Sequence, residues 1–171
     1  VHGLRRVGDG GRGAFFPEYQ RKDSLVDMTD EWACAVELIQ TEMKVGKLAY
    51  FGLSMGSLYG LPFVASRTDV TVATLGLMGV QTNFPHGETL LKAAELIACP
   101  ILFLMQLEDE LFNRQGCLDV FDAFASKDKR LHANPGLHPE VPNEEIDFTF
   151  DFMLSHINGT QAKKVVNIIS D

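Results

Sequence analysis

The sequence GLSMG at residues 52–56 places a serine, Ser54, between two glycines. A serine hydroxyl attacks a carbonyl carbon once a base removes its proton, so Ser54 is a candidate nucleophile for acyl transfer. The string alone is weak, but a short apolar run precedes it and a helical pattern follows it. A sharp strand-to-helix turn presents a nucleophilic serine in this way. We expect Gly52 and Gly56 to let the turn close, and the Met55 amide at the helix N-terminus to bind an oxyanion.

His138 is the candidate base. It lies in NPGLHP, residues 134–139, between a predicted strand and the last predicted helix. Proline and glycine favour a turn there, and a turn at the end of a strand projects the imidazole over the sheet. The other histidines suit the role less well, because they lie in a glycine-rich segment, in an earlier loop, in a strand and in a helix: His2, His86, His132 and His156.

The third candidate is an acid that orients the imidazole and stabilises its charged form. Three acids compete in QLEDE, residues 106–110, directly after a predicted strand. We choose Asp109, because a short turn after the strand places it over the carboxyl end of that strand. Glu108 is the second choice and Glu110 the third.

Alternating strands and helices must position these residues. Apolar runs indicate buried strands at Lys47–Gly52, Val70–Gly79 and Ile101–Met105, and a fourth, short strand is expected at Lys129–His132. Three- and four-residue spacing of apolar residues indicates helices from Thr29 or Asp30 to Gly46, over 55–66, Gly87–Ala98 and Gln115–Ala125, and from Asn143 or Glu144 to Ile157. Strands that are apolar on both faces predict a mostly parallel sheet with helices on both faces, an α/β fold. Residues 1–28 show no clear period, and the glycines between positions 3 and 13 favour a flexible loop there.

Composition narrows the classes of partner. The net charge is −8 and the basic residues are scattered, which argues against nucleic acid and anionic membranes as partners. The three cysteines, Cys34, Cys99 and Cys117, form no CxxC pair and suggest free thiols in a reducing compartment. No apolar run reaches the 18 or so residues of a membrane span, and no signal peptide is visible. We therefore expect a cytoplasmic protein that needs no metal or organic cofactor.

Three motifs together resemble those of the α/β-hydrolase superfamily: GLSMG, the turn at residues 106–109, and PGLH at residues 135–138. The closest resemblance is to dienelactone-hydrolase-like and prolyl-oligopeptidase-like esterases, and it covers about residues 29–158. It implies a carboxylic ester hydrolase in which Ser54, His138 and Asp109 act through an acyl-enzyme intermediate on a small-molecule ester. The order serine, acid, histidine is the order of that superfamily. Gln106 stands where the family usually carries a glycine.

A complete member of the superfamily has several strands before the nucleophile strand. One of their loops supplies a second oxyanion amide, often in a His-Gly motif, but we assign His2-Gly3 to a later loop. We therefore expect residues 1–171 to form a single, incomplete domain whose sheet lacks its N-terminal strands. Missing residues, or another copy in a homo-oligomer, are expected to complete the sheet. An apolar pocket is expected near the motif loops, from Phe15, Phe16, Leu111, Phe112 and Leu137.

Two other functions stay open at this point. The first alternative is a truncated, non-catalytic unit with a structural or partner-binding role. The second is a hydrolase of thioester, lactone or peptide bonds.

Overall fold

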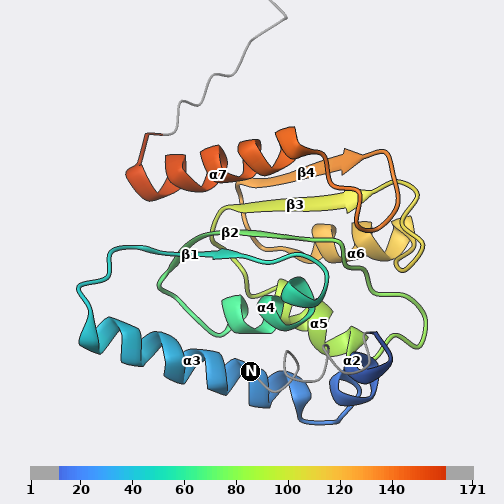
Figure 1. Cartoon of the computed structure of the whole chain (residues 1–171), viewed down its shortest axis with the longest axis horizontal. Helices are drawn as coiled ribbons and strands as arrows, with labels where there is room; N and C mark the ends of the chain where they lie inside the picture. Colours follow the sequence, from blue (N-terminus) through green and yellow to red (C-terminus); the bar gives the residue numbers. More distant parts are fainter. Residues whose placement is uncertain (1–11, 161–171) are drawn as a thin grey trace, which may run out of the picture.

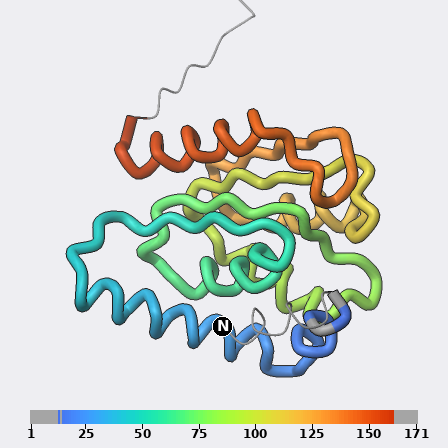
Figure 2. The backbone as a smooth tube through the Cα atoms, viewed as in Figure 1, coloured from blue at the N-terminus to red at the C-terminus, as the bar shows by residue number. Residues whose placement is uncertain are grey.

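The structure is a computed structural model that describes residues 12–160 (Figure 1). Its elements, in chain order, are α2 (Arg12–Tyr19), α3 (Ser24–Glu42), β1 (Leu48–Phe51), α4 (Met55–Ala65), β2 (Val70–Gly76), α5 (Gly87–Ala94), β3 (Ile101–Gln106), α6 (Arg114–Ala123), β4 (Lys129–Asn134) and α7 (Asn143–Asn158). Figure 2 traces the path of the chain through these alternating strands and helices.

The four strands form one parallel sheet in the order β1-β2-β3-β4. Each strand is connected to its neighbour through a helix, as parallel pairing requires. The register places Gly76 of β2 beside Leu104 of β3, and Gln106 of β3 beside Asn134 of β4. The carboxyl ends of all four strands therefore meet at one edge, where the loops after β1, β3 and β4 carry the candidate site.

Helices cover both faces of the sheet (Figure 1). On one face, Phe152 and Met153 of α7 pack against Val72, Leu102 and Leu104. On the other face, a larger core lies beneath α4, α5 and α6, and α3 packs against α4. All six residues of β3 are buried, as expected for a central strand covered on both sides. The predicted α/β class is confirmed.

The helical structure of residues 12–28 was not predicted from the sequence, and the glycine-rich loop expected over residues 3–13 lies outside the described residues except at its end, where Gly13 is helical. Residues 12–19 form α2, and α3 begins at Ser24 rather than at Thr29 or Asp30. Phe15 and Tyr19 lie four residues apart on one face of α2, and both bury their rings against Tyr59 of α4. This tertiary burial stabilises a short helix that contains Pro17, a poor helix residue by local preference.

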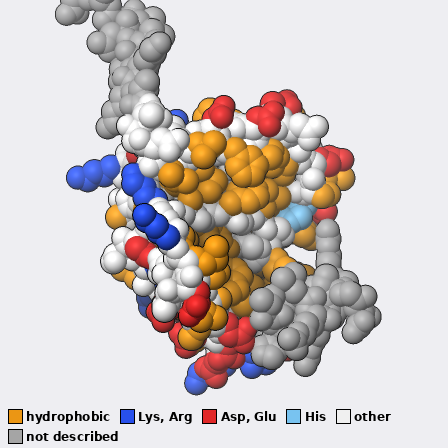
Figure 3. Space-filling view, turned by 60° about the vertical axis from the view of Figure 1, so that its left-hand side comes forward, with side chains coloured by type: hydrophobic (Ala, Val, Ile, Leu, Met, Phe, Trp, Pro, Cys, Tyr) orange, Lys and Arg blue, Asp and Glu red, His pale blue; other side chains and the backbone are white. Residues whose placement is uncertain are grey.

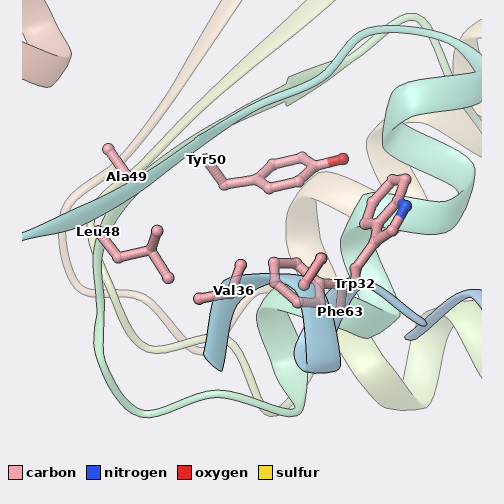
Figure 4. A pocket seen from close by; sticks show the side chains of 7 residues that line it. Trp32, Val36, Leu48, Ala49, Tyr50 and Phe63 are labelled. Atoms are coloured by element: carbon pink, nitrogen blue, oxygen red, sulfur yellow. The ribbon is translucent and has the colours of Figure 1, made fainter. Parts of the chain in front are cut away.

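The free edge of β1 is apolar. Among the described residues, β1 pairs with β2 alone. A groove of about 280 Å³ follows its other edge, lined by Trp32, Ala35, Val36, Leu48, Ala49, Tyr50 and Phe63 (Figure 4). On the α7 side, the rings of Phe51 and Phe150 lie 6.0 Å apart, and both are exposed. Hydrophobic side chains gather on the face that Figure 3 shows. No described helix is long and apolar enough to cross a membrane.

Candidate active site

Ser54 lies on the turn between β1 and α4, and its backbone is strained. Its φ is 54° and its ψ is −116°, a region that residues with a side chain rarely adopt. Such a conformation costs about 1–3 kcal/mol and persists only where the surroundings impose it. Here the Ser54 N–H donates to the Gly76 carbonyl at 2.9 Å, which extends the pairing of β1 with β2 into the turn.

The two glycines of GLSMG have different roles. A Cβ on Gly52 would lie 2.7 Å from the Gly56 carbonyl oxygen and 2.8 Å from Cε1 of Tyr50, so only glycine fits there. A Cβ on Gly56 would meet nothing within 4 Å. The expectation that both positions must be small for the turn to close is therefore wrong for Gly56. The space that the turn needs is provided by Gly52.

Ser57 supports the turn from below, and sequence reasoning missed it. This fully buried hydroxyl lies 2.7 Å from the carbonyl oxygens of Gly52 and Gly76, and 2.7 Å from the Gly76 N–H that donates to it. It joins the ends of β1 and β2 directly beneath Ser54. The only signal in the sequence is one small polar residue within an otherwise apolar helix, and such a residue has many ordinary explanations.

Ser54, His138 and Asp109 come together above the sheet. Oγ of Ser54 lies 2.8 Å from Nε2 of His138, and Nδ1 of the same ring lies 2.8 Å from Oδ2 of Asp109. The side chains of His138 and Asp109 are 7% and 1% exposed. A carboxylate accepts the Nδ1 proton and leaves Nε2 to accept the hydroxyl proton of the serine, which is the tautomer that a base needs.

The carboxylate of Asp109 is held by the turn that carries it. Its Oδ1 accepts the N–H groups of Leu111 and Phe112 at 2.8 and 3.1 Å, so Oδ2 faces His138. Burial, with a smaller contribution from the negative charge of Asp109, raises the pKa of the Cys117 thiol to about 12. Cys117 is therefore a neutral packing residue beside the site.

Glu108 and Glu110, the other acids considered, bind the backbone of the loop that carries His138. Glu108 accepts the N–H of Gly136, and Glu110 accepts the backbone N–H of His138. The remaining described histidines are engaged elsewhere. His86 lies 2.7 Å from the Tyr19 carbonyl, His132 pairs with Glu145, and His156 pairs with Asp128. His2 and Gly3 lie outside the described residues.

Met55 is the first residue of α4, where backbone N–H groups lack partners within the helix. Among the described residues, no backbone hydrogen bond is found for its N–H. This amide directly follows Ser54 at the positive end of the helix dipole, which suits an anionic oxygen.

Of the apolar residues predicted to line a pocket near the site, only some lie beside it. Phe112 is buried with its ring 5.7 Å from that of His138, and Phe84 continues the contact at 5.6 Å. Phe15 belongs to the core, whereas Phe16 and Leu137 are exposed. In the described part of the chain, no group of three or more His, Cys, Asp or Glu side chains is arranged to hold a metal ion.

Solved structures resemble this chain. A zinc-bound form of a cold-adapted esterase from an Arctic intertidal metagenomic library is 36% identical and superposes with a TM-score of 0.80 over 86% of this chain. This chain belongs to the α/β-hydrolase superfamily. It covers 66% of that esterase's chain, and 62% of the chain in a PEG-bound complex of the same esterase, just under two thirds in both cases.

More distant α/β-hydrolase structures share the fold. The Paleococcus ferrophilus monoacylglycerol lipase is 15% identical, with a TM-score of 0.59 over 76% of this chain and 75% of its own. The Pyrococcus furiosus esterase Pf2001 is 11% identical, with a TM-score of 0.66 over 81% of this chain and 64% of its own. No protein-family model and no curated protein matches the sequence. The resemblance to the superfamily is confirmed, and the finer likeness to dienelactone hydrolases and prolyl oligopeptidases stays a prediction.

Proposed function

We propose that this α/β-hydrolase is a serine hydrolase of carboxylic esters. The observation that carries the proposal is the hydrogen-bonded series Ser54–His138–Asp109, with both contacts at 2.8 Å. Similarity to the Arctic esterase, at 36% identity, supports the ester as the bond that is cleaved. Small-molecule esters remain the expected substrates, and the cytoplasm remains the expected location.

The proposed reaction proceeds through an acyl-enzyme. His138 takes the proton of Ser54 while Oγ attacks the ester carbonyl, and the imidazolium is stabilised by Asp109. The Met55 N–H donates to the oxyanion of the tetrahedral intermediate. His138 then protonates the leaving alcohol, and water, activated by the same imidazole, releases the acid and restores the Ser54 hydroxyl.

The strained backbone of Ser54 favours catalysis over a purely structural role. A turn without a nucleophile would be more stable with glycine at this position, because glycine adopts positive φ freely. Retaining a side chain there costs about 1–3 kcal/mol and directs the hydroxyl at His138. We therefore place the non-catalytic alternative second.

The test compares the chain with Ser54→Ala on p-nitrophenyl acetate. We expect kcat to fall by about 10⁶, the loss typical of removing a serine nucleophile. Labelling of Ser54 by a fluorophosphonate would support the same role independently. Equal release of nitrophenol by the two proteins would refute the proposal. If Ser54→Ala is inactive as expected, matched acetyl ester, thioester and anilide substrates show which of these bonds the protein cleaves.

A further inference from the structure

The loop that carries His138 is joined to the end of β3. Backbone pairing continues beyond the strand: the Leu107 N–H donates to the Asn134 carbonyl at 2.8 Å, and the Glu108 N–H donates to the Gly136 carbonyl at 3.2 Å. Gly136 has a φ of 118°, so the loop turns sharply directly after this last backbone contact. The position of His138 therefore depends on what holds residues 135–140.

Three carboxylates hold three successive amides of this loop. The N–H groups of Gly136, Leu137 and His138 donate to Glu108 at 2.5 Å, Glu140 at 2.7 Å and Glu110 at 2.9 Å. Hydrogen bonds to an ionised acceptor are stronger than neutral ones. All three glutamates are exposed, so each hydrogen bond competes with water. Because the three hydrogen bonds hold neighbouring peptide units of one short loop, they restrain the loop together.

Gln106 holds the same loop from the buried side. Its side chain lies in the core, 2% exposed, and Nε2 donates to the Glu140 carbonyl at 2.6 Å and toward the Pro135 carbonyl at 3.4 Å. These two carbonyls are at the start and the end of the loop. Gln106 is the last residue of β3, Glu108 and Glu110 follow it at every second position, and all three reach residues 135–140.

We propose that Gln106, Glu108 and Glu110 are positioning residues that fix the imidazole of His138 between Ser54 and Asp109. They act on the loop backbone, whereas Asp109 contacts the ring itself. The proposal rests on the proposed hydrolase function. Catalysis requires reacting groups within a few tenths of an ångström, and a misplacement of about 1 Å can cost about 10² in rate. Freeing one side of the loop should therefore lower kcat without changing substrate affinity.

The kinetic test uses Glu110→Ala, Glu110→Gln and, as a matched control, Glu95→Ala at an exposed position at the end of α5. We expect Glu110→Ala to lower kcat per phosphonate-titrated site by about tenfold, with KM within about twofold. Glu110→Gln should keep most of the activity, because its side-chain oxygen still accepts the His138 N–H. Unchanged kcat in Glu110→Ala, or equal losses in all three variants, would overturn the proposal.

A second measurement needs no turnover. The proton shared by Nδ1 of His138 and Asp109 should give a low-field NMR signal, and amide exchange reports on residues 136–138. In Gln106→Leu and Glu110→Ala we expect this signal to broaden or vanish while the melting curve stays cooperative. A sharp, unshifted signal in both variants would overturn the positioning role. A wild-type chain that neither turns over esters nor reacts with phosphonate would refute the hydrolase function, and the NMR result would still decide the positioning role.

Discussion

Replacing Asp109 by Asn is expected to remove most activity through the tautomer of His138. The carboxylate accepts N–H groups from Leu111, Phe112 and Nδ1 of His138, and it is 1% exposed. In the Asp109→Asn variant the single side-chain oxygen is needed by the two backbone N–H groups, so the amide NH₂ faces Nδ1. Nδ1 then becomes the acceptor and the ring proton moves to Nε2. That nitrogen faces Ser54 as a donor and no longer serves as a base.

Such a change of tautomer typically costs about 10⁴ in kcat. At about 1.36 kcal/mol for each factor of ten, this is about 5 kcal/mol of transition-state stabilisation. The assay is hydrolysis of p-nitrophenyl acetate, with melting curves to show that both proteins are folded. Glu95→Gln is the matched control, because it makes the same change from carboxylate to amide at an exposed position at the end of α5 and leaves the ring contact intact. A loss below about tenfold in Asp109→Asn, or equal losses in both variants, would refute the reasoning.

Three further predictions concern the surroundings of the site. Ser57→Ala should lower the free energy of unfolding by about 1–3 kcal/mol in urea titration, because buried backbone groups lose their partner; an unchanged midpoint would contradict this. Gly52→Ala should lower the free energy of unfolding, because the new Cβ would lie 2.7 Å from the Gly56 carbonyl oxygen. Gly56→Ala should leave that free energy unchanged or raise it by up to about 1 kcal/mol, and similar losses in the two variants would refute the distinction. Near pH 8, iodoacetamide should label exposed Cys34 and spare Cys117, whose pKa burial raises to about 12; rapid labelling of Cys117 in peptide mass spectra would show that it is accessible.

The strands, and the helices after Ser54, were predictable from the sequence because their signals are local. β1, β2 and β3 are short, largely apolar runs, and the turn at Ser54 has a recognisable pattern of small residues; β4, which is mostly polar, was expected from its place between two helices. The choice of acid was not decided in this way, since Glu108, Asp109 and Glu110 share one turn. The decisive feature is the pair of backbone N–H groups that fixes the Asp109 carboxylate, and it exists only in the folded turn.

Other features depend on contacts between distant segments. The helix at residues 12–19 is formed because Phe15 and Tyr19 bury their rings against α4, which no local pattern reveals. The role of Ser57 depends on the two backbone segments that approach its hydroxyl. Gln106 offers a third case, because a polar side chain at the end of an apolar strand gives no hint that it reaches both ends of another loop.

The candidate nucleophile and the candidate base follow different strands of the sheet. Ser54 follows β1 and His138 follows β4, the two outer strands of the sheet formed by residues 12–160, with β2 and β3 between them. No residue of β4 is fully buried, whereas every residue of β3 is. Outer, poorly buried strands open at lower free energies than the whole fold. Denaturant should therefore inactivate the protein before its helical circular dichroism falls, and early inactivation would report on the detachment of β4.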